Sequence, residues 1–399
     1  MNTNKNNSDL KISIIVSDLS SKGSGRWGGG VRPFLIAEAL TRLGYQVRIF
    51  GLGFDSETPR FSTKIPITYI PCDYYSNLFG ASKELLSCID GDIIYAVKLK
   101  VSSFGIGIIK KLLARKPLIL DIDDWEMSWY GGDDWRLGLN PLKFMKEVIK
   151  GDGKLRNPDH PFYLRRLEKF TSYADAITTH NLFLQKRFGG IYIPQGKDLQ
   201  LFNPANYNQK TVKEKYGLQD YRVLMFPGAP RPYKGVEDVL RALDILNEED
   251  LRLVIVGGSP YDDYDQYLQE KWAKWLIYLP PQPFEMMPEM VTGADIMVIP
   301  QRDTLETIAQ FPLKLTDAMT MAKPILATKV GDIPELLQDT GYLVEPESPS
   351  AIAETIQNIF NDYATALNKG LQARERYFMY FSLEQMEFML QQVIDSVIT

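Results

Sequence analysis

Two positively charged residues lie in a loop rich in glycine and proline, between an apolar run and a helical pattern. The loop at 228–235 carries Arg231 and Lys234. The apolar run at 223–226 predicts a strand, and apolar residues spaced by three and four predict a helix at 235–246. Such a loop turns backbone N–H groups and the positive end of a helix dipole toward an anion, and the cations add full charges. The alternative is an ordinary turn with solvated cations, and the stretch alone favours neither.

A second candidate is a run of three glycines, Gly28, Gly29 and Gly30, before a predicted helix at 31–43. Glycines let a ligand approach the backbone closely. The spacing is not GxGxxG, and no acidic residue ends the next strand, which argues against a dinucleotide-dependent dehydrogenase. A flexible surface loop is the alternative.

A third candidate is the carboxylate cluster Asp121, Asp123, Asp124 and Glu126, which follows a predicted strand at 117–120. The carboxyl end of a parallel strand is where α/β sheets place their ligands. Capping of the turn by aspartate is the alternative explanation.

Composition limits the classes of protein. The chain of 399 residues favours two domains, and 45% hydrophobic with 24% charged residues is typical of a globular protein. A net charge of −5 does not indicate nucleic-acid binding. Two cysteines and two histidines indicate neither a disulfide framework nor a histidine metal centre. The first nine residues lack an apolar signal core, and no run approaches the ~20 apolar residues of a membrane span. We therefore expect a cytoplasmic protein.

Strands and helices are predicted to alternate through both halves of the chain, which indicates two α/β domains with parallel sheets covered on both faces. The boundary is expected at the irregular stretch 194–210. All three candidate stretches then lie at the carboxyl edges of the sheets, facing a cleft between the domains. The predicted strands are 11–16, 46–50, 65–70, 93–97, 117–120, 174–179, 191–193, 223–226, 251–256, 276–279, 296–299, 325–328 and 341–344. The predicted helices are 31–43, 83–89, 101–113, 139–149, 182–188, 235–246, 261–275, 287–291, 313–321, 333–337, 350–360, 368–377 and 383–398.

The region 139–169 is basic in an otherwise acidic chain, and its first part has the pattern of an amphipathic helix. Such a segment suits the surface of an anionic membrane, whereas a solvated helix face is the simpler interpretation. Just before it, Trp125, Trp129, Tyr130 and Trp135 are suited either to an aromatic wall for an acceptor or to the core.

Several motifs in order resemble glycosyltransferase family 4, the retaining, nucleotide-sugar-dependent enzymes with the GT-B fold of two Rossmann-like domains. In the second half they are the loop at 228–235 and the segments 253–257, 294–300, 312–324 and 331–335. In the first half they are 28–31, 174–179 and 193–198. The resemblance covers nearly the whole chain.

The resemblance implies an acceptor-side domain at 1–204, joined by the helix at about 380–399, and a donor-binding domain at 205–379. It implies that Lys234 and Arg231 stabilise the leaving diphosphate, with no metal required and a nucleoside-diphosphate sugar as co-substrate. It further implies that Asp317 binds the ribose. The remaining donor-binding residues implied are Gly29, Gly30, Gly228, Gln282, Pro283, Leu313 and Lys314.

The sequence also departs from the family pattern. Ala229 stands where the family arginine usually follows the loop glycine, and Ala309 stands where the first glutamate of an E-x7-E motif is expected, with Glu306 as a nearby substitute. Asp123 stands where a histidine is frequent. In the family this position lies beside the donor sugar and the acceptor, so we expect a catalytic role for Asp123. Neighbouring Asp121, Asp124, Trp125 and Trp129 are then expected near the acceptor.

The leading hypothesis is a retaining glycosyltransferase that moves a sugar to a hydroxyl of a glycan, lipid or small-molecule acceptor. Because two family residues are missing, a catalytically degenerate nucleotide-sugar-binding partner subunit is the second hypothesis. A third treats Asp121 and Asp123 as the metal-binding DxD motif of the other glycosyltransferase fold. The sugar, the base, the acceptor and the oligomeric state are not predicted.

Overall fold

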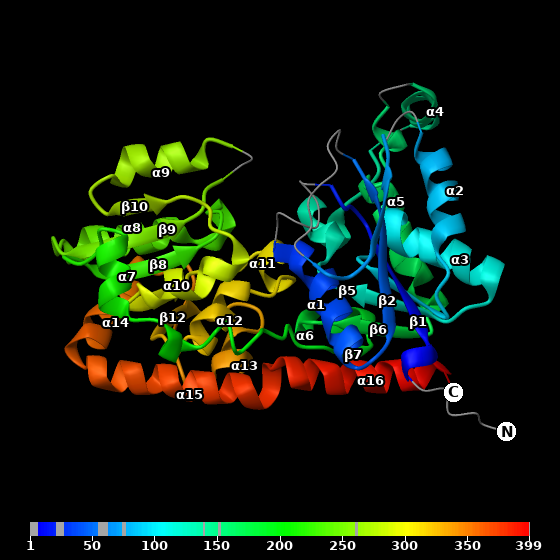
Figure 1. Ribbon diagram of the computed structural model, residues 1–399. Coiled ribbons are helices and arrows are strands. Elements are labelled where there is room, and N and C mark those ends of the chain that lie inside the picture. The colour runs from blue at the N-terminus through cyan, green and yellow to red at the C-terminus, as the bar shows by residue number, and fades with distance from the viewer. Residues whose placement is uncertain are drawn as a thin grey trace. The chain divides into compact units, whose positions relative to one another are not determined.

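The computed structural model of the protein describes residues 7–20, 28–54, 63–73, 77–138, 140–150, 153–259 and 262–398 (Figure 1). The chain divides into two compact units. Unit 1 comprises Met1–Gly196 and Leu383–Thr399, and unit 2 comprises Lys197–Ser382. The chain passes from unit 1 to unit 2 between Gly196 and Lys197, which is earlier than the boundary expected after residue 204. The reason is that Leu199, Leu201 and Phe202 pack into the core of unit 2.

Unit 1 is built on a parallel sheet in the order β3-β2-β1-β4-β5-β6-β7. Its register places Ile14 between Ile49 and Tyr95, so that apolar residues align across the middle of the sheet. The strands are β1 (Lys11–Val16), β2 (Gln46–Gly53), β3 (Ile67–Pro71), β4 (Ile93–Val97), β5 (Leu118–Ile122), β6 (Ala176–Thr179) and β7 (Ile191–Tyr192).

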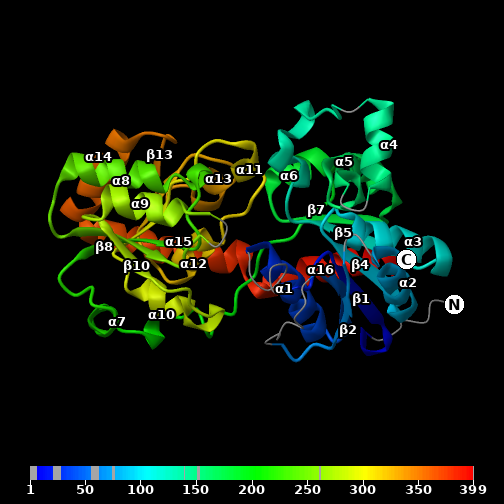
Figure 2. The same ribbon diagram turned by 90° about the horizontal axis from the view of Figure 1, so that it is seen from above.

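Helices cover both faces of this sheet. On one face, α1 (Gly28–Arg42) and α16 (Leu383–Ile398) lie side by side and share a core with the strands (Figure 2). On the other face, α3 (Ile106–Ala114) packs on Ala96 and Leu118, which point away from that core, and α2 (Leu78–Cys88) lies against α3. The remaining α-helices of unit 1 are α4 (Pro141–Ile149), α5 (Pro161–Leu167) and α6 (Leu182–Phe188).

Unit 2 has a second parallel sheet, in the order β10-β9-β8-β11-β12-β13. Alternate residues of its central strand β8 (Arg222–Pro227) enter opposite cores: Val223 and Met225 pack on one face, and Leu224 and Phe226 on the other. Its other strands are β9 (Leu251–Val256), β10 (Leu276–Leu279), β11 (Ile296–Ile299), β12 (Ile325–Thr328) and β13 (Tyr342–Val344). This two-sided burial explains the continuous apolar runs seen in the sequence.

Both faces of the second sheet are covered by helices. Residues of α8 (Val236–Leu246) and α14 (Pro349–Asn361) fill one core, and residues of α12 (Leu313–Thr320) and α15 (Tyr363–Phe381) fill the other. The further α-helices are α7 (Gln209–Lys215), α9 (Tyr264–Trp272), α10 (Met287–Thr292), α11 (Leu305–Ile308) and α13 (Ile333–Leu337).

Short helices of other types connect these elements. The 3-10 helices are Asn7–Asp9, Glu126–Tyr130, Gly132–Asp134, Lys154–Arg156, Glu168–Tyr173, Pro204–Asn206, Pro232–Lys234 and Phe284–Met286. A π-helix, Val101–Gly105, precedes α3. The predicted α/β class with parallel sheets is confirmed.

Several predicted helix limits are wrong. α1 already begins at Gly28, and α2 begins at Leu78 and not at residue 83. The predicted helix 101–113 is divided into the π-helix and α3, and α4 begins at Pro141 because Asn140 caps it through a hydrogen bond from the Lys143 N–H. The sequence patterns also missed α5 and α7, which are short.

Candidate functional site

The cationic loop of unit 2 lies between β8 and α8, as expected. Gly228 and Gly235 adopt positive φ angles of 107° and 70°. At Gly235 a Cβ would collide with the Pro300 carbonyl oxygen, so this turn requires glycine. Arg231 caps the short 3-10 helix that contains Lys234, and α8 starts directly after Gly235.

Lys234 is a cation without an acidic partner in the described part of unit 2. Its Nζ donates a hydrogen bond to the Ala229 carbonyl oxygen at 3.0 Å. Burial lowers the pKa of Lys234 to about 7, and repulsion from Lys314 and Arg231 adds to this effect. A bound anion would oppose both causes, because it supplies the missing opposite charge.

Lys314 is the second such cation, in the first turn of α12. Its Nζ lies 4.4 Å from the centroid of the Phe226 ring. Burial lowers the pKa of Lys314 to about 8, although Asp317 partly opposes the shift. The N terminus of α12 follows Pro312 and has no side-chain cap, so the backbone at Leu313 and Lys314 presents the positive end of the helix dipole.

Arg231 differs from the two lysines because its charge is neutralised. Its Nη1 donates to Asp262 Oδ2 at 2.5 Å, and only 13% of the side chain is exposed. An anion would have to compete with Asp262 for this guanidinium. Sequence analysis did not identify that competition.

Asp317 is paired with a lysine that sequence analysis did not select. The Nζ of Lys197 lies 2.6 Å from Asp317 Oδ1, and the two side chains are only 5% and 11% exposed. The Lys197 ammonium also lies over the rings of Phe202 and Phe284, at 4.7 and 5.6 Å from their centroids. Lys197 belongs to one of the family-like motifs, but nothing in that motif indicates its partner.

The remaining predicted donor residues lie in surface turns or first helical turns. Gln282 follows β10, and its Nε2 donates to the Pro280 carbonyl oxygen at 3.2 Å, with Pro283 exposed beside it. Ala309 is fully buried after α11, whereas Glu306 in α11 is partly exposed. Gly29 and Gly30 form the first turn of α1, and residues 21–27 of the predicted loop lie outside the described chain.

In unit 1, Asp121 is a structural carboxylate. Arg32 Nε and Nη2 donate to its two oxygens at 2.7 and 2.8 Å, and Thr178 Oγ1 donates at 2.6 Å. Arg32 and Asp121 are both fully buried. The expectation that Asp121 lies near an acceptor, and the DxD hypothesis that uses it as a metal ligand, do not agree with this arrangement, because Arg32 and Thr178 occupy the carboxylate.

Asp123 is different, because neither of its oxygens accepts a hydrogen bond from any residue that the structure describes. The side chain is 1% exposed, and Lys98 Nζ lies 3.4 Å from Oδ1. Burial raises the pKa of Asp123, and Lys98 opposes the shift. A buried carboxylate with free lone pairs is suited to accept hydrogen bonds from a ligand.

Carboxylates and lysines surround Asp123. Burial raises the pKa of Asp124 to about 7, and the Trp129 Nε1 donates to this carboxylate at 3.4 Å. Burial alone would raise the pKa of Glu126, but Lys100 and Lys98 lower it below its usual value. Glu126 belongs to the predicted carboxylate cluster, whereas sequence analysis missed Lys98. Lys98 directly follows β4, just as Asp123 and Asp124 follow β5. Its position at the end of a strand could therefore have identified it as a candidate.

The tryptophans divide between core and surface. Trp125 is buried, its Nε1 donates to Glu168 Oε1 at 2.7 Å, and Arg187 stacks over its ring at 4.0 Å. These contacts place Trp125 in the core, which was the alternative for this residue, and its contact with an acceptor stays a prediction. Trp129 is 43% exposed and stays a candidate.

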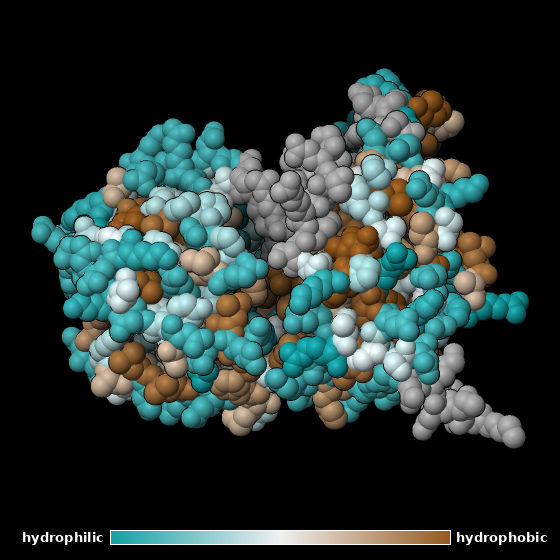
Figure 3. All heavy atoms as spheres, viewed as in Figure 1, coloured by the Kyte–Doolittle hydropathy of each residue, from teal (hydrophilic) through white to brown (hydrophobic). Residues whose placement is uncertain are grey.

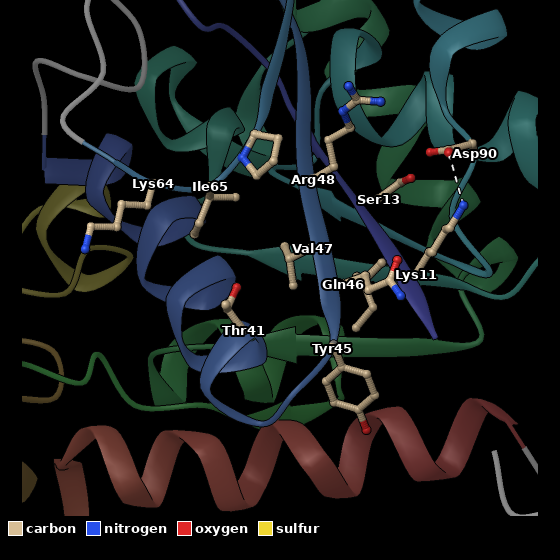
Figure 4. A pocket seen from close by; sticks show the side chains of 12 residues that line it. Lys11, Ser13, Thr41, Tyr45, Gln46, Val47, Arg48, Lys64, Ile65 and Asp90 are labelled. Atoms are coloured by element: carbon tan, nitrogen blue, oxygen red, sulfur yellow. Dashed lines mark ion pairs between the residues drawn. The ribbon is translucent and has the colours of Figure 1, made fainter. Parts of the chain in front are cut away.

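Unit 1 also has a pocket whose lining does not include Asp123, Lys98 or Trp129 (Figure 4). It is lined by residues at the amino ends of β1 and β2, including Lys11 and Gln46, and Lys11 pairs with Asp90 at 3.8 Å. The carboxyl ends of the strands, where α/β sheets place ligands, are at the opposite edge.

Residues 221–362 match the family described as Glycosyl transferases group 1. A curated relative, the D-inositol 3-phosphate glycosyltransferase of Corynebacterium glutamicum (strain R), is 26% identical over 91% of this chain and 91% of its own length. The protein carries a glycosyl transferases group 1 domain and is a glycosyltransferase. The domain contains the cationic loop, Lys314 and Asp317 of this enzyme.

Other relatives agree with this assignment. The GDP-mannose-dependent alpha-(1-6)-phosphatidylinositol monomannoside mannosyltransferase of Mycolicibacterium smegmatis is 25% identical to this glycosyltransferase over 52% of the chain and 59% of its own length. Among solved structures, Anabaena HepE in complex with UDP and glucose has a TM-score of 0.73 at 17% identity, covering 97% and 100% of the two chains. WaaG, which is involved in lipopolysaccharide biosynthesis, has a TM-score of 0.66 at 14% identity, covering 96% and 99%. The predicted family resemblance and the GT-B fold of the enzyme are confirmed.

Proposed function

We propose that this glycosyltransferase moves a sugar from a nucleoside diphosphate to an acceptor hydroxyl with retention of configuration, without a metal. The proposal depends on one observation: Lys234 and Lys314 form no ion pair with a carboxylate in the described structure, and burial lowers their pKa values to about 7 and about 8. Two neighbouring unneutralised cations are costly to bury. A diphosphate is the natural counter-charge.

These groups suit the departure of a nucleoside diphosphate. As the bond from the anomeric carbon to the phosphate oxygen breaks, negative charge grows on the leaving group. Lys234, Lys314 and the N terminus of α12 are then preorganised positive groups at one place, which is how transition-state charge is stabilised most effectively. Arg231 contributes after it exchanges Asp262 for phosphate oxygens.

Other roles follow from chemistry already described. Asp317, held by Lys197, offers carboxylate oxygens to ribose hydroxyls, and the backbone at Gln282 and Pro283 offers polar groups to the base. Asp123 is proposed to accept a hydrogen bond from a sugar hydroxyl and to receive the acceptor proton. Retention then depends on attack from the face of the departing phosphate.

The relatives suggest substrates to test. One bears a name that specifies GDP-mannose and a phosphatidylinositol mannoside, another specifies inositol 3-phosphate, and one solved neighbour was crystallised with UDP. We therefore propose UDP- or GDP-sugars as donors and a cyclitol phosphate, a glycan or a lipid-linked sugar as acceptor. We further propose a cytoplasmic location.

The decisive experiment measures release of nucleoside diphosphate from a panel of UDP-, GDP- and ADP-sugars, with EDTA present and absent. We expect turnover with at least one donor, unchanged by EDTA, and a loss of about 100-fold or more in Lys234→Ala. Lys329→Ala, an exposed lysine paired with Glu345 in the same unit, is the matched control.

Two outcomes would contradict the proposal. Diphosphate binding without turnover for any donor and acceptor would favour the catalytically degenerate partner subunit. Turnover in Lys234→Ala equal to that of the control would remove the phosphate assignment.

A further inference from the structure

Helix α4 of unit 1 turns its apolar side toward solvent. Leu142 is 82% exposed, Met145 59% and Ile149 72%. The opposite side attaches the helix to the protein: the ring of Phe144 packs on that of Phe162 at 5.2 Å, and Glu147 accepts a hydrogen bond from the Lys154 N–H at 2.9 Å. The exposed apolar residues are therefore not an incomplete core, because the inward side has its own contacts.

Successive helical residues are about 100° apart, so Leu142, Met145 and Ile149 share one face of α4. We call these three side chains the outer face of α4. Figure 3 shows apolar surface over this helix. Exposed apolar residues gathered in one place, unlike isolated ones, indicate a binding surface.

Lysines accompany the outer face. Lys143 and Lys146 lie on α4 and are exposed, and Lys150 follows the helix. Residues 139–169 contain eight Lys or Arg against four Asp or Glu, which gives +4 in a chain whose net charge is −5. The basic charge is therefore concentrated where the apolar face is exposed.

We propose that α4 lies in the surface of an anionic lipid bilayer, with its outer face in the acyl boundary and Lys143 and Lys146 among the headgroups. An apolar helix face flanked by lysines is the combination that such a surface binds, since burial of apolar area and attraction to anionic lipids act together. The helix has nine residues, too few to cross a bilayer, so in this proposal it lies along the bilayer surface. No helix in the described chain is long and apolar enough to cross a membrane.

The charge decides between a membrane and a second copy of the chain. A second copy would bring another set of lysines against Lys143 and Lys146, and like charges facing each other weaken an interface. An anionic bilayer supplies the opposite charge. The proposal does not depend on the donor site in unit 2.

The test is co-sedimentation of the full chain with vesicles of phosphatidylcholine alone or of phosphatidylcholine mixed with phosphatidylglycerol. We expect binding to the mixed vesicles that falls with added salt. The variant Leu142→Ser/Met145→Ser/Ile149→Ser should bind at least about tenfold more weakly, and Lys143→Gln/Lys146→Gln should lose most of the preference for phosphatidylglycerol.

The matched control is Leu371→Ser/Met379→Ser on α15, where both side chains are more than half exposed. There the nearby Lys369, Arg374 and Arg376 are each tied to the protein by a hydrogen bond to a backbone carbonyl. This control should bind vesicles like the unaltered protein. Circular dichroism checks that each variant folds.

Three results would overturn the proposal: no sedimentation of the unaltered protein with mixed vesicles, equal binding by the outer-face variant, or a dimer in sedimentation velocity that this variant abolishes while vesicle binding is unchanged. UDP and GDP binding without vesicles should be the same in all variants. Vesicle binding therefore tests the membrane proposal, and nucleotide binding and turnover test the transfer reaction, so that either proposal can fail without the other.

Discussion

The ammonium of Lys197 lies 2.6 Å from the Asp317 carboxylate, and both side chains are almost completely withdrawn from solvent. Asp317 is therefore held in place by a charge from the first residue of unit 2, far away in the sequence. A ribose that binds Asp317 would meet a carboxylate already oriented by Lys197. This pairing connects the stability of unit 2 with the orientation of the carboxylate that we propose as the ribose ligand.

We expect Lys197→Met to destabilise unit 2 by about 3 kcal/mol, because removing one partner of a buried pair leaves the other charge uncompensated. The double variant Lys197→Met/Asp317→Leu should recover part of this loss. Urea unfolding measures both. Lys329→Met, whose partner Glu345 is exposed, should cost at most about 1 kcal/mol. Equal losses in the two single variants would show that the Lys197 pair has no special strength.

Nucleoside diphosphate binding should be accompanied by proton uptake. The pKa of Lys234 is lowered to about 7 and that of Lys314 to about 8, so the two lysines lose their protons as pH rises from about 6 to 9 in the free protein. A bound diphosphate raises both pKa values again. UDP or GDP affinity should therefore be highest below pH 7 and fall as pH rises. Calorimetry in buffers of different ionisation enthalpy at pH 8 should detect uptake, and Lys234→Met should reduce it.

Asp123→Asn should slow sugar transfer and leave UDP or GDP affinity nearly unchanged. The amide keeps the size of the carboxylate but cannot receive a proton, and Lys98 loses one of its two acidic partners while Glu126 stays. Steady-state kinetics together with calorimetry separate the two effects. Asp90→Asn, which alters the exposed partner of Lys11, is the control. If Asp123→Asn weakens nucleotide binding instead, the carboxylate belongs to the donor site and not to the transfer step.

The unaltered enzyme should also lose activity in acid. Burial raises the pKa of Asp123, so protonation of this carboxyl begins at a higher pH than for an exposed aspartate. The proton acceptor is then present above that pKa and lost below it. A pH profile of turnover should show this acidic decline, and Asp123→Asn should be slow at every pH. An acid limb that persists unchanged in Asp123→Asn would assign it to another group, with Asp124 the first candidate.

Arg32→Lys should destabilise unit 1 by about 3 kcal/mol or more. A lysine cannot reproduce the two-oxygen contact that Arg32 makes with Asp121, and the carboxylate would stay buried. Urea unfolding followed by tryptophan fluorescence measures the change. The comparison variant is Arg42→Lys, where the arginine is 47% exposed and pairs with Glu387, and it should cost at most about 1 kcal/mol. A loss in Arg32→Lys no larger than that in Arg42→Lys would show that the two-oxygen contact with Asp121 contributes little to the stability of unit 1.

Local patterns predicted much of the architecture. Apolar runs such as 223–226 became buried strands, and the helical spacing after Gly235 became α8, because burial and backbone hydrogen bonding act on neighbouring residues. The cationic loop was placed correctly between them. Helix ends were less predictable: α1 includes its glycines, and α4 starts only where Asn140 caps it.

Side-chain partners were not predictable in the same way. Trp125 and Asp121 have the residue types of a ligand site, yet one is buried against Glu168 and the other against Arg32. Lys98 reaches Asp123 because β4 and β5 are adjacent in the sheet. The order of strands in the sheet brings such residues together, and that order cannot be derived from the spacing of residues in the sequence.

The sequence by itself therefore determined the α/β class, the family resemblance and the cationic loop between β8 and α8, since these depend on residues close together along the chain. The tertiary structure decided which charges are neutralised: Asp121 by Arg32, Arg231 by Asp262 and Asp317 by Lys197, but not Lys234 or Lys314 within the described chain. The physical reason is that charge compensation depends on distance and burial, which arise only when segments far apart in sequence pack together.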